Sequence, residues 1–153
     1  MDNTDNIENK ENTENIKKEE SKYLEINPEQ LVKSKELAER IGAVLDDKKA
    51  KSIKIIETNR QTIIADYFVI ATGTSSTHIR SLAGEVEFQL KDKYNAEPSR
   101  VSGRDSTDWI ILDYDSVLVH IFNSEARDYY KLEKLWGDGG SVNVEELLKL
   151  DKK

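Results

Sequence analysis

Residues 108–122 read DWIILDYDSVLVHIF and hold the side chains best suited to a polar or aromatic contact. Two short apolar runs flank Asp115 and Ser116, so we expect two β-strands that meet at a two-residue turn. With that turn Tyr114 pairs with Val117, and every second residue outward from this pair forms an apolar face that belongs against helices. A three-residue turn would shift the pairing by one residue and exchange the two faces.

The other face of this hairpin mixes an indole, a carboxylate and an imidazole with apolar side chains. Burial of an unpaired carboxylate or imidazole costs several kcal/mol, so this face is predicted to stay at least partly exposed. A tryptophan on such a face is typical of a protein interface. The alternative is that Trp109 is covered by the chain's own tail or by a second copy. The predicted partner-binding residues are Asp108, Trp109, Ile111, Asp113, Leu118, His120 and Phe122.

Catalytic chemistry has few candidates in this chain. Asp113 and Asp115 form a DxD pattern suited to a divalent ion, and the turn Gly73-Thr74-Ser75 is suited to a phosphate. A chain reversal at Asp115 would spoil the regular strand that places both carboxylates on one side. There is no cysteine, and the two histidines have no spacing that indicates a nucleophile and its base. We therefore expect no enzyme, metal or cofactor; the alternative is a nucleotide-binding or nucleotidyltransferase-like enzyme that uses the Gly73-Thr74-Ser75 turn.

The elements that precede the hairpin follow from the periodicity of apolar residues. Asn27 and Pro28 are typical of a helix start, and apolar residues at helical spacing continue to Asp46 and Asp47. Alternation over residues 51–56 predicts a strand with one buried side, and the unbroken apolar run from Tyr67 to Ala71 predicts a strand covered on both faces. These two strands are expected to be neighbours and parallel.

Three further helices are predicted from capping residues and apolar spacing. They begin at Ser75 or Ser76, at Asn123 or Ser124 with an end at Gly137, and at Asn143. The middle one is expected to line one side with Ala126, Tyr129, Leu132 and Trp136. The order of helices and strands predicts an α/β fold with a small mixed sheet and helices mainly on one face.

Charge and composition divide the chain. The net charge of the 153 residues is -7, and residues 1–30 hold nine acids against four lysines. We expect residues 1–26 to form a disordered acidic arm, residues 27–137 one domain, and residues 138–153 a tail with a short helix. The near-neutral body argues against broad nucleic-acid binding, although a local basic patch is compatible with it. The sequence shows no apolar stretch long enough for a membrane, so a cytoplasmic protein is expected.

Four segments in a fixed order carry a family resemblance. They are residues 65–76 (ADYFVIATGTSS) together with His78, residues 108–114 (DWIILDY), residues 119–122 (VHIF) and residues 130–137 (YKLEKLWG). On these segments the chain resembles the ribosomal silencing factors, also called the Iojap family, from about Pro28 to Gly137. The acidic arm departs from the family pattern, and Asp115 stands at the turn where members often have glycine.

The resemblance implies a regulator without catalytic activity. Members bind the large ribosomal subunit through its ribosomal protein number fourteen and block its association with the small subunit, which represses translation. The implied fold is nucleotidyltransferase-like without the active site, and members are often dimeric when free. The implied partners are therefore the large subunit and a second copy, with no membrane and no direct sequence-specific nucleic-acid binding. Asp108 and Asp113 would then face basic residues of the ribosomal protein.

Overall fold

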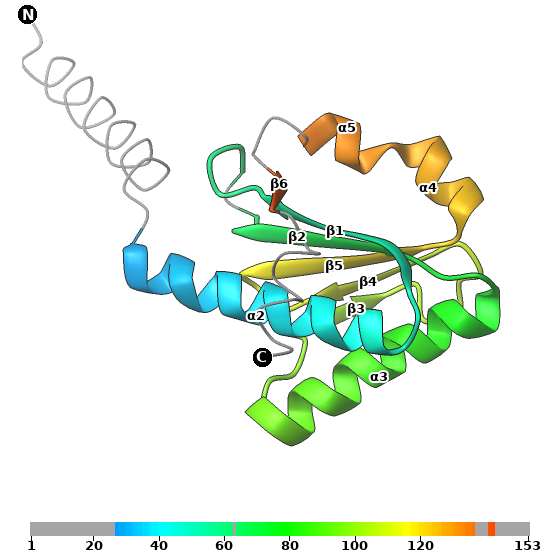
Figure 1. Ribbon diagram of the computed structural model, residues 1–153, viewed down its shortest axis with the longest axis horizontal. Helices are drawn as coiled ribbons and strands as arrows, with labels where there is room; N and C mark the ends of the chain where they lie inside the picture. Colours follow the sequence, from blue (N-terminus) through cyan, green and yellow to red (C-terminus); the bar gives the residue numbers. More distant parts are fainter. Residues whose placement is uncertain (1–26, 63, 137–140, 143–153) are drawn as a thin grey trace, which may run out of the picture.

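The computed structural model describes residues 27–62, 64–136 and 141–142, which form one sheet with helices on both sides (Figure 1). The helices are α2 (Pro28–Asp47), α3 (Ser76–Tyr94), α4 (Ser124–Tyr130) and α5 (Leu132–Trp136). The strands are β1 (Lys51–Glu57), β2 (Tyr67–Thr72), β3 (Arg100–Ser102), β4 (Trp109–Asp113), β5 (Val117–Phe122) and β6 (Ser141–Val142). Within this part of the chain no helix is long and apolar enough to cross a membrane. The predicted acidic arm and the predicted helix after Asn143 lie outside the described residues.

The six described strands lie in the order β3-β4-β5-β2-β1-β6. Among them only β2 and β5 run parallel, and α3 is the helix that crosses between them, so the sheet is mixed as predicted. β1 and β2 are neighbours, but the prediction that they are parallel is wrong, because they pair antiparallel. Residues 58–66 are too short for a helical crossover. Instead, the backbone amides of Thr58 and Asn59 donate to the Asp66 carbonyl at 2.8 and 3.1 Å and close a hairpin loop.

The predicted hairpin of β4 and β5 is confirmed with its register. Ile110 lies opposite Ile121, Leu112 opposite Val119, Trp109 opposite Phe122, Ile111 opposite His120, and Asp113 opposite Leu118. Asp115 adopts a left-handed φ of 66°, and the amide of Ser116 donates to the carbonyl of Tyr114 at 2.8 Å. Aspartate tolerates this backbone region better than most residues, which explains how the turn forms without glycine.

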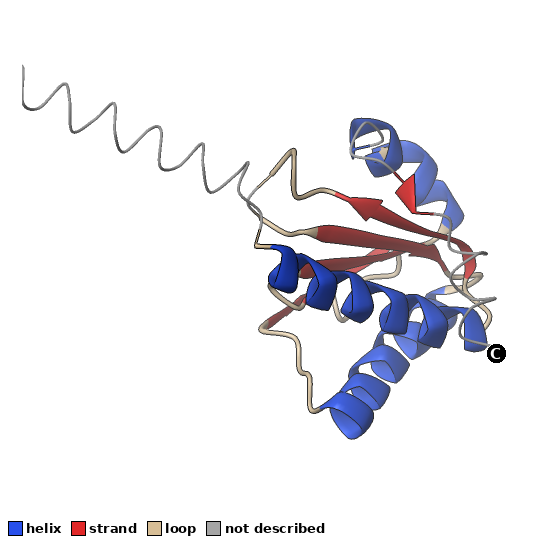
Figure 2. Ribbon diagram, turned by 60° about the vertical axis from the view of Figure 1, so that its left-hand side comes forward, coloured by secondary structure: helices blue, strands red, loops and turns tan. Residues whose placement is uncertain are grey.

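α2 and α3 pack side by side against one face of the sheet, and α4 and α5 lie on the other (Figures 1 and 2). The larger core lies under α2 and α3, where helix residues such as Ile41 and Leu82 meet Leu112 and Val119 of the hairpin. All six residues of β2 are buried, as predicted for a strand covered on both faces. β1 does not keep the predicted single buried side, because Ile55 joins the larger core and Ile56 joins a smaller cluster on the opposite face.

The caps of the helices follow the sequence. The side chain of Asn27 accepts from the Glu29 amide at the start of α2, and those of Ser75 and Asn123 accept from amides in the first turns of α3 and α4. The single helix predicted from residue 124 to 136 is instead two helices, separated at Lys131, which has a left-handed φ of 48°. β3 and β6 were not predicted, since strands of three and two residues leave no periodic pattern.

Candidate partner-binding site

The face of the hairpin that turns away from α2 and α3 carries the predicted partner-binding residues. Asp108, directly before β4, is exposed, and Trp109, Ile111, Asp113 and Leu118 are half-buried. This part of the face is accessible, as predicted.

Two predicted residues of the same face are not accessible. The side chains of His120 and Phe122 keep only 5% and 1% of their surface exposed. The expectation that they lie on the open surface is wrong. Phe122 packs in one cluster with Ala126 of α4, and Leu132 of α5 lies against that cluster. His120 contacts the rings of Phe68, Trp109 and Phe122. Both side chains contact the ring of Trp109 and so support the accessible part of this face from beneath.

Trp109 lies at the centre of an aromatic cluster. Its ring stacks on Phe122 with centroids 4.8 Å apart, and Tyr130 of α4 contacts its ring at 4.7 Å. Its indole Nε1–H donates to Nδ1 of His120 at 3.2 Å. Its backbone amide donates to the hydroxyl of Ser106 at 3.2 Å, within the loop that leads into β4. The indole is therefore fixed by ring contacts and by hydrogen bonds before any partner arrives.

His120 holds the indole as a neutral acceptor. An indole N–H only donates, so Nδ1 of His120 must be the unprotonated nitrogen and Nε2 carries the hydrogen. Nε2 has no hydrogen-bond partner among the described residues, and the ring contacts Phe68 at 4.9 Å. Burial lowers the pKa of His120 from 6.5 to about 4. Near neutral pH the imidazole is uncharged, which suits the acceptor role.

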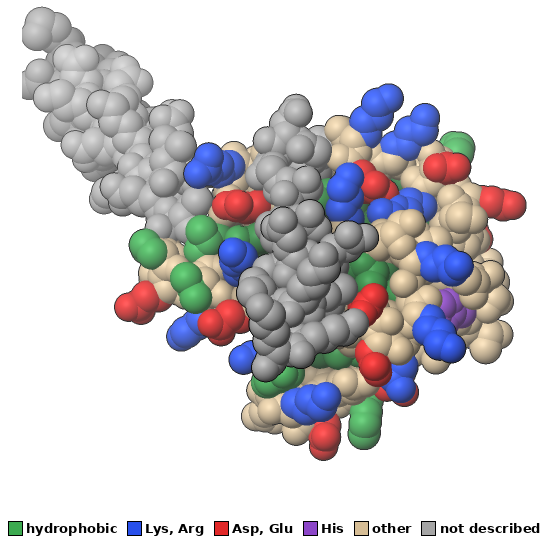
Figure 3. All heavy atoms as spheres, viewed as in Figure 1, with side chains coloured by type: hydrophobic (Ala, Val, Ile, Leu, Met, Phe, Trp, Pro, Cys, Tyr) green, Lys and Arg blue, Asp and Glu red, His purple; other side chains and the backbone are tan. Residues whose placement is uncertain are grey.

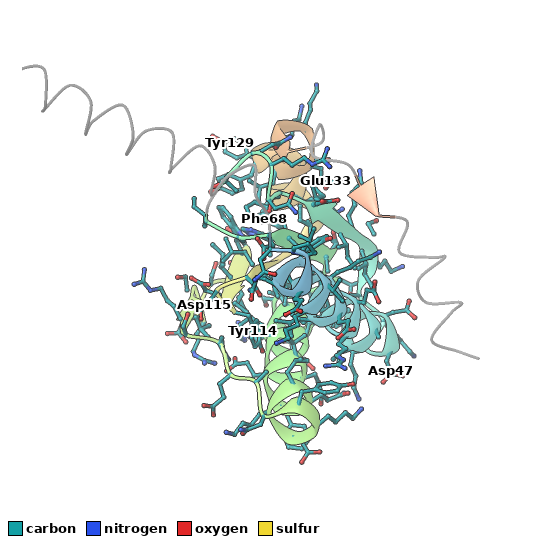
Figure 4. The ribbon with its side chains drawn as sticks, turned by 90° about the vertical axis from the view of Figure 1, so that its left-hand side faces the viewer. Asp47, Phe68, Tyr114, Asp115, Tyr129 and Glu133 are labelled. Carbon is teal, nitrogen blue, oxygen red and sulfur yellow. The ribbon has the colours of Figure 1, made fainter. Side chains whose placement is uncertain are left out.

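Sequence reasoning missed the contribution of α4 to this surface. Tyr130 is 49% exposed although it contacts Trp109, so it extends the aromatic surface beyond the hairpin. Tyr129 was predicted to share one side of a helix with Ala126, but Ala126 is buried, whereas Tyr129 is 81% exposed and projects away from the sheet on the side of α4 (Figure 4). The same view places Phe68 on the α4 side of the sheet and Tyr114 on the α3 side. The adjacent residues Tyr129 and Tyr130 were the signal in the sequence that could have indicated an exposed aromatic surface on this helix.

We name the accessible surface the docking face and define it by its members. They are Asp108, Trp109, Ile111, Asp113, Leu118 and Tyr130. Its two carboxylates are oriented by the surrounding chain: Oδ1 of Asp108 accepts from the Asn123 side-chain amide at 2.8 Å, and Oδ1 of Asp113 accepts from the Asp115 backbone amide at 2.8 Å. The Oδ2 atom of each has no partner among the described residues and is available to a cationic donor.

The alternative site at Gly73-Thr74-Ser75 gains no support from the geometry. The amide of Thr74 donates to Nδ1 of His78 at 2.9 Å, and the amide of Gly73 donates to the carbonyl of Phe122 at 2.8 Å. The hydroxyl of Ser75 accepts from the His78 amide at 3.0 Å and thus caps α3. The amides of Gly73 and Thr74 are therefore engaged within the chain and are not free to hold a phosphate.

The DxD pattern does not assemble a metal site in the described part of the chain. The Asp113 carboxylate binds the backbone amide of Asp115, and the Asp115 carboxylate accepts from the hydroxyl of Ser99 at 3.0 Å. No group of three or more metal-ligating side chains occurs among the described residues. The arrangement of this region is suited to binding a macromolecular surface.

The chain is similar to known proteins of one family. Residues 32–153 match the family model described as "Ribosomal silencing factor during starvation". A ribosomal silencing factor from Halalkalibacterium halodurans is 32% identical over 115 residues, which cover 75% of this chain and 97% of that protein. A protein from Arabidopsis thaliana named "Protein Iojap-related, mitochondrial" is 38% identical over 101 residues, or 63% of this chain and 54% of that protein. A crystal structure of a Chromobacterium violaceum protein superposes with a TM-score of 0.62 at 30% identity, covering 74% of this chain and 90% of that one.

Proposed function

The chain belongs to the ribosomal silencing factor family, and on that premise we propose that it represses translation by binding the large ribosomal subunit. In this proposal the docking face contacts ribosomal protein number fourteen, and the bound protein occupies space that the small subunit needs. Obstruction of this kind requires affinity and position but no catalytic group. The protein is accordingly expected where ribosomes work, in the cytoplasm, and cell fractionation that places it elsewhere would contradict this.

The observation that supports the docking face most directly is the way Trp109 is held. Its indole is half-buried, stacked on Phe122 and bonded to His120, so little side-chain freedom remains to be lost on binding. Interfaces obtain most of their affinity from a few such fixed aromatic anchors. Tyr130 beside it widens the apolar contact to two rings.

The carboxylates of Asp108 and Asp113 add selectivity. Asp108 directly precedes Trp109 and Asp113 ends β4, and each carboxylate keeps one oxygen without a partner among the described residues. A partner surface that carries arginine or lysine would form charge-assisted hydrogen bonds with them, which also speeds encounter at low salt. A basic ribosomal protein meets this requirement.

We also propose that the free protein forms a homodimer in which each copy covers the docking face of the other.

Co-sedimentation with purified large subunits tests the proposal. We expect Trp109→Ala to bind at least about 30-fold more weakly, the effect of losing a hot spot of about 2 kcal/mol. Phe88→Ala is the matched control, because Phe88 is a 66% exposed aromatic residue on α3, which covers the opposite face of the sheet. Its affinity should match that of the unchanged protein within about twofold, the size of a neutral surface change.

Because Trp109→Ala also removes packing, a second variant keeps the fold intact. Asp108→Asn retains an oxygen that accepts from Asn123 but loses the negative charge, and we expect binding to weaken about threefold to tenfold. A gradient of mixed small and large subunits should show fewer joined ribosomes when the unchanged protein is present. Wild-type affinity for both variants would refute the assigned face, and unaltered joining would refute the repressor function.

A further inference from the structure

A pocket of about 480 Å³ lies at the end of the sheet where β2 stops and α4 begins. Its walls include the start of β1, Thr72 at the end of β2, and residues of α4 and α5. Lys51 pairs with Thr72 across the sheet, so the first residue of β1 borders the pocket. The proposed function makes no use of this site.

Arg127 builds the inner wall of the pocket. Its guanidinium donates to the hydroxyl of Thr72 at 2.8 Å, to the backbone carbonyl of Ser52, and to the carboxylate of Glu133. Ser52 has a left-handed φ of 50° within a register shift of β1, which leaves its carbonyl available to the arginine. The contact between Arg127 and Glu133 depends on the break at Lys131, because residues six apart on a continuous helix project about 120° apart around its axis and do not meet.

The rim of the pocket is basic. Lys51, Lys131 and Lys134 are exposed, and none of these side chains has an ion-pair or hydrogen-bond partner among the described residues. Arg127 and Glu133 neutralise each other, and Asp128 is the other acidic residue that lines the pocket. The lining therefore has an excess of positive charge in a chain whose net charge is -7. Figure 3 shows Lys and Arg side chains gathered over the part of the molecule where Figure 1 places α4 and α5.

We propose that this pocket binds phosphates of the ribosomal RNA backbone beside the site where the docking face contacts the ribosomal protein. The proposal rests on the proposed function for the identity of the RNA. Three lysines at an open rim fit successive phosphates of a polyanion, because each ammonium displaces a counterion and needs no defined approach angle. The contact is to the backbone, so it carries no sequence preference.

The position of α4 explains how both surfaces meet one particle. Tyr130 contacts Trp109 on one side of α4, and Arg127 of the same helix lines the pocket on another. Lys131 follows Tyr130 directly in the chain. If the docking face contacts a protein of the large subunit, the pocket faces the part of the subunit next to that protein. In a ribosomal subunit the abundant anionic component next to a protein is rRNA.

The salt dependence of binding to large subunits tests the pocket separately from the docking face. In the variant K51Q/K131Q/K134Q the slope of log affinity against log salt should fall in magnitude by about 2 to 3, because each phosphate that a lysine no longer neutralises removes about 0.7 to 0.9 from the slope. The control K33Q/K35Q/K93Q removes the same charge from exposed positions on α2 and α3 and should leave the slope unchanged. Equal slopes for both triple variants and the unchanged protein would overturn the proposal.

A titration of the isotope-labelled unchanged protein with a short RNA hairpin, followed by NMR, gives a readout that does not need ribosome binding. Shifts confined to the amides around Lys51, Thr72 and residues 127–134 are expected. Equal or larger shifts with ATP at the same concentration would indicate a mononucleotide site and overturn the assignment to RNA, as would the absence of shifts at the pocket. If the unchanged protein does not sediment with large subunits while the RNA shifts the pocket, the proposed function fails and phosphate binding stands.

Discussion

The burial of His120 predicts a pH-dependent loss of stability. In the unfolded chain the imidazole binds a proton below pH 6.5, whereas in the folded protein burial lowers its pKa to about 4. Between these values the unfolded state holds more protons than the folded state, so the free energy of unfolding falls as the pH falls. At about 1.4 kcal/mol per pH unit, the loss is absent above pH 6.5 and reaches about 3 kcal/mol below pH 4.

The variant His120→Gln isolates this contribution. A glutamine oxygen still accepts from the indole of Trp109, but the side chain does not titrate. Urea unfolding at about pH 7 and about pH 4.5, followed by circular dichroism, should show the unchanged protein losing about 2 kcal/mol more than the variant over that interval. Carboxylates contribute equally to both proteins and cancel in the comparison. Parallel pH profiles would refute the argument that an uncharged, buried imidazole supports the docking face.

Two other predictions concern packing and association. A Cβ on Gly73 would lie 2.7 Å from Cγ1 of Ile79, so Gly73→Ala should lower the free energy of unfolding by about 1 to 3 kcal/mol. A Cβ on Gly84, inside α3, meets no atom within 4 Å, so Gly84→Ala should raise the free energy of unfolding by about 0.5 to 1 kcal/mol. Urea unfolding of the two variants tests these predictions, and equal effects of the two substitutions would contradict them. If the homodimer buries the docking face, saturating large subunits should abolish dimers in sedimentation velocity, and unchanged dimerisation would exclude a shared face.

The sequence allowed the hairpin to be predicted in detail because two local signals agree there. Alternation in the two strands and a two-residue turn at Asp115 both require the register that is observed. The parallel arrangement of β1 and β2 was a wrong prediction, since pairing direction depends on where the connecting loop returns. No residue in the loop 58–66 indicates by its type alone that the two strands pair antiparallel.

The site was only partly predictable for a related reason. Trp109 and Asp113 could be placed on one face by their spacing, but the burial of Phe122 involves Ala126 of α4, which comes from a later part of the chain. The break at Lys131 also escaped prediction, because lysine is a good helix former and nothing in its residue type indicates the left-handed backbone found there. Periodicity describes single elements, and the accessible surface depends on how several of them pack.

The parallel pairing of β2 with β5 has a consequence for biosynthesis. Tyr67 pairs with Val117 and Thr72 with Phe122, so the two central strands are separated by about fifty residues of chain. Contacts between such distant residues carry a loop-closure cost and slow folding compared with local pairings. During translation β2 and β5 cannot pair until residues up to 122 have left the exit tunnel of the ribosome. A nascent chain therefore completes its docking face late in its own synthesis, after the ribosome, the proposed target of the protein, has translated most of the chain.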